Sequence, residues 1–144
     1  MLKITNRNTV DIITVNPPYK EKNTGCINEG KVKYIARHEE LCTLEDIFKT
    51  SSSLLENKGK LYIVHKPERL ADLISIARKY KLEPKKLKLV CPTINSAPSI
   101  VLLEYIKGGG NEMKILKPLI EYDENNNYTE EMNKVYNIES NLNI

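Results

Sequence analysis

Long hydrophobic runs are missing from this chain of 144 residues. No apolar stretch approaches the roughly 20 residues that a membrane-spanning helix needs. The first ten residues, MLKITNRNTV, also lack the apolar core of a secretory signal peptide. These absences argue against a membrane protein or a secreted protein, and they predict a soluble chain in the cytoplasm.

Cysteine and histidine are too few and too scattered to predict a metal centre. The cysteines, Cys26, Cys42 and Cys91, are odd in number and stand far apart. This pattern indicates neither a disulfide framework nor a zinc site. The two histidines, His38 and His65, are too few for a His-based site, so we expect no bound metal.

Charge is distributed unevenly along the chain. Residues 1–110 hold 19 basic and 12 acidic side chains, whereas residues 111–144 hold 3 basic and 7 acidic ones. A basic surface suits a polyanionic partner such as nucleic acid, although lysine-rich surfaces also serve solubility alone. We expect one domain, with its main part in 1–110 and a C-terminal extension of that domain in 111–144, whose end frays.

Hydrophobic patterning predicts alternating strands and helices. Strands are expected at 10–15, 60–65, 87–91 and 99–106, and the first is expected to be buried because it is short, apolar and β-branched. Helical stripes follow Thr43 and Pro67. The order strand, helix, strand, helix, strand, strand is typical of an α/β fold whose first three strands are parallel. The last strand should turn back in an antiparallel hairpin.

Helix boundaries and turns are indicated by particular residues. Thr43 is expected to be an N-cap, with Asp46 completing a capping box, and Gly59 is expected to end that helix in a left-handed conformation. Pro67 suits the first turn of the second helix. The triple glycine 108–110 opens no helical pattern, so it predicts a flexible turn rather than a phosphate-binding loop.

The stretch DIITVNPPYK ends an apolar strand on an amide, two prolines and an aromatic ring. Ligands of α/β sheets bind at the carboxyl ends of strands. There, the Asn16 side chain and the Pro17 carbonyl would form a pair of acceptors, which Pro17 and Pro18 hold rigid. Tyr19 adds a flat face for stacking. The arrangement predicts a clamp for a planar amine, the alternative being a proline-rich turn that Asn16 merely caps.

The sequence Asn-Pro-Pro-Tyr after an apolar strand resembles the signature of class I, S-adenosylmethionine-dependent amino methyltransferases. Further blocks resemble one branch of them, the bacterial tRNA(Val) adenine methyltransferases. These blocks are YIARHE, CTLEDIFKTSSSLLENKGKLYIVHKPERL, SAPSIVLLEYIKGGG and YDENNNYTEEMNKVY. The resemblance runs from Asp11 to Tyr136 and implies a Rossmann-like fold and methylation of the exocyclic amino group of adenine in tRNA.

The resemblance also implies roles for individual residues. Asn16 and the Pro17 carbonyl would accept hydrogen bonds from the target amine, Pro18 would keep the clamp rigid, and Tyr19 would stack on the base. Asn16 would also border S-adenosylmethionine, the implied cofactor. Basic residues after the clamp would hold the phosphates of the tRNA partner, namely Lys20, Lys22, Lys31, Lys33 and Arg37.

One family feature is missing from the sequence. Family members bind S-adenosylmethionine on a glycine-rich loop and an acidic residue that precede the Asn-Pro-Pro-Tyr block by dozens of residues. Here 15 residues precede Asn16, and none is glycine. We therefore expect the carboxyl half of a methyltransferase, with the early strands and the main cofactor loop missing, and inactive alone.

Two classes of function stay open beside this interpretation. In the first class, the chemistry is retained and the substrate is DNA adenine or a glutamine amide of a release factor. In the other class, the chain is a non-catalytic interaction module. In either case its exposed sheet edge would pair with a missing N-terminal half or with another copy.

Overall fold

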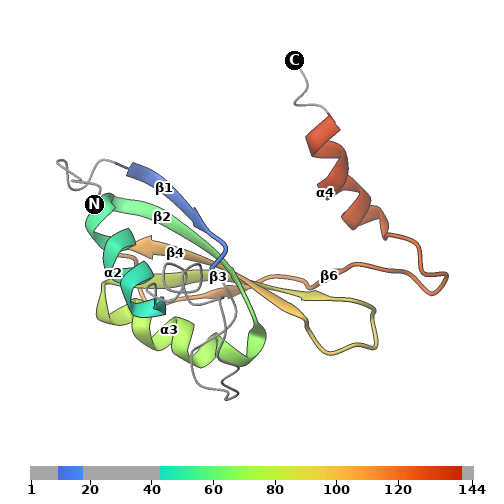
Figure 1. The fold of residues 1–144 in the computed structure, drawn as a ribbon, viewed down its shortest axis with the longest axis horizontal. Coiled ribbons are helices and arrows are strands. Elements are labelled where there is room, and N and C mark those ends of the chain that lie inside the picture. The colour runs from blue at the N-terminus through green and yellow to red at the C-terminus, as the bar shows by residue number, and fades with distance from the viewer. Residues whose placement is uncertain (1–9, 18–42, 141–144) are drawn as a thin grey trace, which may run out of the picture.

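The computed structural model describes residues 10–17 and 43–140. Within these ranges the chain forms an α/β fold in which strands and helices alternate (Figure 1). The elements are β1 (Val10–Val15), α2 (Leu44–Leu54), β2 (Leu55–His65), η1 (Pro67–Arg69), α3 (Leu70–Lys79), β3 (Leu82–Cys91), β4 (Ile100–Lys107), β5 (Lys114–Ile115), β6 (Leu119–Ile120) and α4 (Glu130–Ser140).

The strands form one mixed sheet in the order β1-β2-β4-β3-β5, and β6 also pairs with β3. β1 and β2 are parallel, whereas β4 is antiparallel to both β2 and β3. The predicted hairpin of the last two long strands is therefore confirmed. β1, β2 and β3 run in the same direction, as expected, but β4 separates β3 from β2. We call the edge at which these three strands end the carboxyl edge and the opposite one the amino edge.

The helix α2 begins as the sequence predicted. The Thr43 hydroxyl accepts a hydrogen bond from the Asp46 amide at 3.1 Å, and the Thr43 amide donates to the Asp46 carboxylate at 3.0 Å. The predicted helix end was wrong. The helix stops at Leu54, and residues 55–59 already belong to β2. Lys58, with φ at 68°, adopts the left-handed conformation that the sequence assigned to Gly59.

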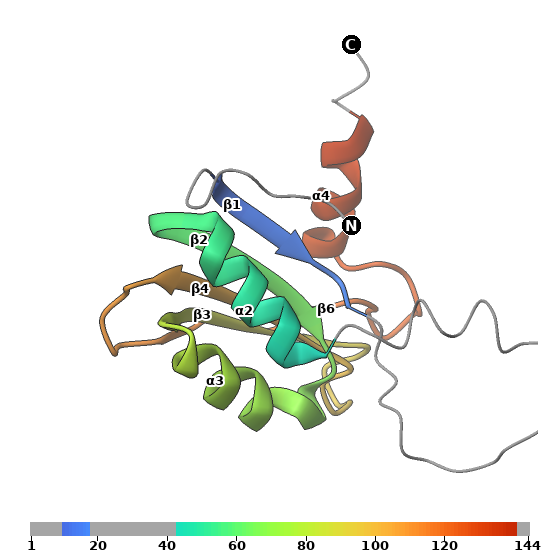
Figure 2. The same cartoon turned by 60° about the vertical axis from the view of Figure 1, so that its left-hand side comes forward.

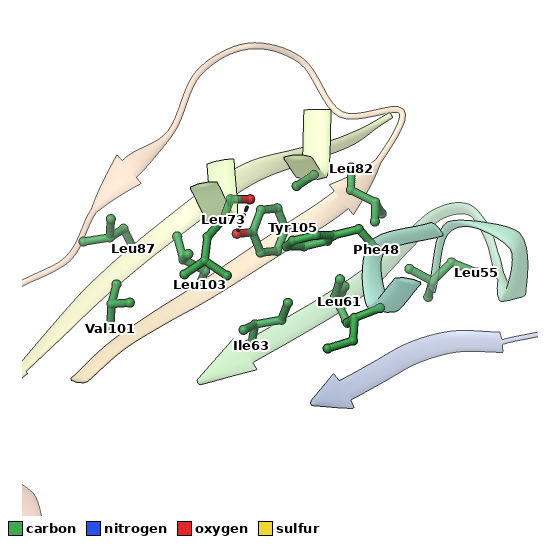
Figure 3. Close-up of a cluster of buried hydrophobic side chains, with 12 residues drawn as sticks. Phe48, Leu55, Leu61, Ile63, Leu73, Leu82, Leu87, Val101, Leu103 and Tyr105 are labelled. Carbon is green, nitrogen blue, oxygen red and sulfur yellow. Dashed lines mark hydrogen bonds between the residues drawn. The ribbon is translucent and has the colours of Figure 1, made fainter. Parts of the chain in front are cut away.

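The core lies between the sheet and the two helices α2 and α3, which cover the same face (Figure 2). Phe48 of α2 packs edge-on against Tyr105 of β4, with ring centroids 5.4 Å apart. The buried Tyr105 hydroxyl donates to the Leu73 carbonyl of α3 at 3.1 Å. Figure 3 shows this cluster, in which one aromatic pair joins both helices to the central strand. We call the covered side of the sheet the near face and the opposite side the far face.

β1 differs in burial from the prediction, although its position is correct. Ile13 and Val15 pack against the core, whereas Ile12 is 57% exposed and points to the far face. Among the described strands β1 stands at the end of the sheet and pairs with β2 alone. The strand is therefore only half buried, because the described part of the chain supplies neither a neighbour on its outer side nor a layer over its far face.

The segment after residue 110 joins the same sheet. β5 and β6 pair in parallel with β3, and the turn predicted at the triple glycine is confirmed, with Gly108 at φ of 66°. α4 then projects away from the sheet (Figures 1 and 2). Among residues 10–17 and 43–140, no helix is long and apolar enough to cross a membrane. The proposed division at residue 110 stays a prediction.

Candidate functional site

The carboxyl edge holds the part of the predicted clamp that the structure describes. Asn16 follows the last residue of β1 and is exposed, whereas Pro17 beside it is buried. Proline has no N–H to extend the ladder, so strand pairing stops here and the chain leaves the sheet. The buried ring of Pro17 fixes the backbone from which the Asn16 side chain extends. The role of Asn16 and Pro17 as acceptors for an amine stays a prediction.

The remaining predicted site residues lie outside the described ranges. They are Pro18 and Tyr19 of the clamp and the basic residues Lys20, Lys22, Lys31, Lys33 and Arg37. His38, Cys26 and Cys42 lie outside them as well. The stacking and phosphate-binding roles therefore stay predictions.

His65 ends β2 at the same carboxyl edge, as its place in the sequence predicted. Its side chain is buried, with 3% exposed, and its Nδ1 accepts a hydrogen bond from the Lys66 amide at 2.8 Å. This hydrogen bond from the backbone fixes the orientation of the imidazole ring, which lies buried at the carboxyl edge. In the described part of the chain, no group of three His, Cys, Asp or Glu side chains is arranged to hold a metal ion.

The connection between β3 and β4 adds an element that sequence reasoning did not assign to the site. It starts from Cys91 at the carboxyl edge and is closed by a hydrogen bond of 2.6 Å between the hydroxyls of Thr93 and Ser96. Ile94 at its tip is 74% exposed. The sequence between β3 and β4 predicts only a short hairpin connection. No signal in it indicates that the tip of this connection places the apolar side chain of Ile94 at the carboxyl edge, where Asn16 also lies.

The described glycines do not build a cofactor cradle beside Asn16. Gly59 lies near the start of β2, and Gly108, Gly109 and Gly110 follow the end of β4, which runs in the opposite direction. All four therefore lie at the amino edge, across the sheet from Asn16. A phosphate or ribose needs close approach to backbone, which glycine permits. The described glycines thus do not form the main binding loop for S-adenosylmethionine, and the role of Asn16 beside this cofactor stays a prediction.

A charged cluster lies on the far face of the sheet. Glu104 of β4 is only 7% exposed, and it accepts a hydrogen bond from the Tyr62 hydroxyl at 2.7 Å. Lys86 and Lys60 place their amines 3.3 and 3.9 Å from its carboxylate. Burial by itself would raise the pKa of Glu104, but the hydrogen bonds from Tyr62 and Lys86 and the two lysine charges lower it below the ordinary value. Glu104 also raises the pKa of Tyr62 through the same hydrogen bond.

Comparison with known proteins connects this fold to methyl transfer. No protein-family model matches the chain. The tRNA1(Val) (adenine(37)-N6)-methyltransferase of Parabacteroides distasonis is 32% identical over 94 residues, which cover 65% of this chain and 39% of that protein. Its counterpart from Porphyromonas gingivalis is 30% identical over 95 residues, or 66% of this chain and 36% of that protein. The chain thus spans less than two fifths of the length of these curated relatives.

Solved structures agree on the fold. A predicted O-methyltransferase from Agrobacterium tumefaciens superposes with a TM-score of 0.68 at 19% identity, over 88% of this chain and 50% of that one. The M protein of the type I restriction enzyme EcoKI matches with a TM-score of 0.50 at 15% identity, over 90% of this chain and 30% of that one. We conclude that the chain has the fold of part of a class I methyltransferase and is a sequence relative of the tRNA1(Val) (adenine(37)-N6)-methyltransferases.

Proposed function

We propose that this chain supplies the substrate-clamping part of an S-adenosylmethionine-dependent methyltransferase that acts on the exocyclic amino group of adenine in tRNA. The observation that carries the proposal is the position of Asn16 and Pro17. An exposed amide and a buried proline stand at the carboxyl end of β1, where ligands of α/β sheets bind. The similarity to enzymes named as adenine methyltransferases supports this substrate class.

The proposed work of the clamp is hydrogen-bond acceptance. An exocyclic amine has two hydrogens, and the Asn16 side-chain oxygen and the Pro17 carbonyl would accept one each. As the amine attacks, it gains positive charge and its lone pair leaves conjugation with the ring. Acceptors that are already in place stabilise this developing charge more than they stabilise the ground state, which lowers the barrier. The clamp needs no general base before attack.

The clamp also has to receive a base that has left its stack. Turning an adenine out of a structured RNA costs roughly a few kcal/mol. Stacking on Tyr19, with Pro18 holding the turn, would offset part of this cost. The basic residues that follow, Lys20 to Arg37, would hold the backbone phosphates. These are the proposed roles of residues outside the described ranges.

Among the described residues, Asn16 alone has a proposed role toward the cofactor. S-adenosylmethionine supplies the methyl group in this class of enzyme, and Asn16 is the described residue that would border it. No step through the cofactor is assigned to this chain, because the described glycines lie at the wrong edge of the sheet to hold it. The proposal therefore includes a requirement for a second methyltransferase part that carries the main cofactor loop.

A chimera tests the function. The 144-residue chain would replace the matched segment of the Parabacteroides distasonis relative, and methyl transfer to tRNA would be measured with labelled S-adenosylmethionine. We expect turnover, and we expect Asn16→Ala to lower the rate by roughly 100-fold or more while the affinity for the cofactor stays nearly unchanged. Asn111→Ala, an exposed amide at the amino edge, is the matched control and should keep full activity.

The outcome decides between the proposed roles of Asn16. A chimera whose Asn16→Ala variant stays within a few-fold of the parent would show that Asn16 only caps the strand. A substrate panel with tRNA, duplex DNA and a release factor then tests the substrate class. Methylation of DNA adenine or of a glutamine amide in preference to tRNA would replace the proposed substrate while retaining the clamp.

A further inference from the structure

Three tyrosines of the segment after β5 stack on one another. The rings of Tyr122 and Tyr128 have their centroids 5.1 Å apart, with an angle of 22° between their planes. Tyr136 continues the row, with its ring centroid 5.2 Å from that of Tyr128 and a tilt of 41°. Tyr122 follows β6, Tyr128 ends the next turn, and Tyr136 lies on α4, so three separate segments supply one row of rings. We call this row the tyrosine ladder.

Hydrogen bonds fix the turn that brings these rings together. The Asp123 carboxylate accepts hydrogen bonds from two backbone amides of the turn, both at 2.9 Å. The Thr129 hydroxyl donates to the Ile120 carbonyl at 2.6 Å and accepts from the Met132 amide at 3.2 Å, which caps the start of α4. The rings therefore hold their arrangement without a partner, and a partner that stacks on them loses little affinity to ordering the ladder.

The ladder lies at the carboxyl edge, as Asn16 does. β6 runs parallel to β3, and after it the Tyr122 amide donates to the Pro92 carbonyl at 2.9 Å, just beyond the end of β3. α4, which carries Tyr136, stands beyond the end of β1 (Figure 1). Along the order β1, β2, β4, β3 and β6, four strand spacings of about 4.8 Å place the ladder about 19 Å from Asn16. Several linked nucleotides span such a distance.

Much of the aromatic surface of the ladder is open to solvent. Tyr128 and Tyr136 are 42% and 48% exposed, so the stack does not serve only to bury the rings. Attachment of α4 to the turn would require apolar volume alone, which leucine also supplies. A fixed aromatic ring with an open face is instead the group on which nucleic-acid bases stack, because every base has a π-face of its own.

The charges around the ladder argue against contact through phosphates. Residues 111–144 hold 7 acidic and 3 basic side chains. The nearby lysines are engaged, since Lys134 lies 2.8 Å from Glu130 and Lys88 lies 2.6 Å from Glu131. Hydrogen bonds from these lysines lower the pKa of both carboxyls, which stay ionised at neutral pH. A nucleic acid would therefore meet the ladder with the faces of unpaired bases, while its phosphates lie elsewhere.

We propose that the tyrosine ladder is a stacking platform for an unpaired nucleotide of the same tRNA whose target adenine enters the clamp at Asn16. This inference rests on the proposed function, which supplies the identity of the partner. The platform adds a contact that depends on base stacking, whereas the proposed function assigns the phosphates to other residues. The competing partner is a second copy of the chain, because the acidic segment 111–144 also complements the basic residues 1–110.

Binding of tRNA to the 144-residue chain tests the platform without methyl transfer. Fluorescence anisotropy of a labelled tRNA would give the affinity of the parent, Tyr136→Phe and Tyr136→Leu. Leucine keeps the apolar volume that attaches α4 but removes the flat face, whereas phenylalanine keeps both. We expect Tyr136→Leu to weaken binding by roughly five-fold or more, the lower end of what one stacked base contributes, and Tyr136→Phe to stay near the parent.

A control and the dependence on salt separate stacking from other effects. Val135→Ala, at a similarly exposed residue of α4 outside the ladder, should leave the affinity unchanged. The slope of log affinity against log salt concentration should be the same for Tyr136→Leu and the parent, because no phosphate contact is lost. Circular dichroism checks that all variants fold.

Several results would overturn the platform. Equal tRNA affinities for Tyr136→Leu and Tyr136→Phe would assign Tyr136 to the attachment of α4. A salt slope that falls with Tyr136→Leu would mean that the ladder acts through phosphates. Dimers that dissociate with Tyr136→Leu in light scattering, at unchanged tRNA affinity, would make a second copy the partner. Absence of tRNA binding by both the chain and the chimera described above would overturn the proposal as well.

The chimera separates failure of the platform from failure of the proposed function. The platform contacts a nucleotide that does not react, so Tyr136→Leu should raise KM for tRNA and leave kcat nearly unchanged. A chimera that binds tRNA through Tyr136 but transfers no methyl group would support the platform and contradict the proposed function. A chimera that methylates tRNA with the same KM in both Tyr136 variants would contradict the platform alone.

Discussion

Tyr19 is proposed to recognise the base by its ring face rather than by its hydroxyl. In the active chimera, Tyr19→Phe should therefore retain most activity, whereas Tyr19→Ala should lose roughly 1–3 kcal/mol of base binding, the usual contribution of one stacked base. Affinity for the tRNA and melting temperature would be measured on the same pair of variants. A large drop in melting temperature with unchanged affinity in the folded fraction would assign Tyr19 to the core instead.

Glu104 predicts a dependence of stability on pH. Its pKa in the folded chain lies below its ordinary value near 4.5, so the cluster stabilises the fold above that value. The contribution is lost as pH falls through the folded pKa, because the protonated carboxyl no longer attracts Lys86 and Lys60. We expect the free energy of unfolding to decline as the pH falls below about 4.5 and through the lower folded pKa of Glu104, and we expect Glu104→Gln to flatten the decline.

Urea unfolding of the isolated chain at several pH values would measure this effect. Glu124→Gln is the control, since Glu124 is exposed in a turn and should leave the slope unchanged. Equal slopes for the parent and Glu104→Gln would show that the ionised Glu104 contributes nothing to acid stability. The measurement concerns the far face alone and does not depend on the proposed enzymatic role.

Among the elements, the pairing of β1 with β2 depends on a glycine. A Cβ on Gly59 would lie 3.0 Å from the Glu56 carbonyl oxygen and from a Leu55 methyl, and 3.2 Å from the Asp11 carbonyl oxygen. These distances are too short for an unstrained contact, and the atoms include backbone on both strands. Gly59 thus lies where the two strands approach closely, and it does not form the helix end that the sequence suggested.

We expect Gly59→Ala to lower the free energy of unfolding by roughly 1–3 kcal/mol, the usual cost of overpacking. Gly110→Ala is the matched control, because a Cβ there meets no atom within 4 Å and should change stability little. Chemical unfolding of both variants would test the difference. If the two substitutions cost the same, the backbone near Gly59 must move freely to admit a methyl group, and β1 would be only loosely held.

For the molecule as a whole, the main prediction is that this chain alone does not bind S-adenosylmethionine with micromolar affinity. The described glycines lie at the amino edge, and Asn16 is the described residue that the proposal places beside the cofactor. Isothermal titration calorimetry of the purified 144-residue chain would decide the question. Micromolar binding would mean that residues outside the described ranges build a cofactor site for which the sequence shows no signal.

Local patterns in the sequence were enough to predict most of the long strands and the two helices on the near face. The alternation of apolar runs with helical stripes located β1, β2, α3, β3 and β4, and the capping residues Thr43 and Asp46 placed the start of α2. These predictions succeeded because each depends on contacts within a few residues or on a simple period. The sequence also predicted that β1 ends at Asn16, since a strand cannot continue through two prolines.

Only the tertiary structure decided how those elements share space. In the tertiary structure β4 lies between β2 and β3, and β1 is half exposed at the end of the sheet. Gly59, which the sequence predicted as a helix end, lies instead where β1 and β2 approach closely. The tertiary structure also brought Tyr62, Lys86 and Glu104 together from three strands on a face that no described helix covers. The sequence could not show these relations, because each depends on which strands become neighbours, and that is set by packing between residues far apart in the chain.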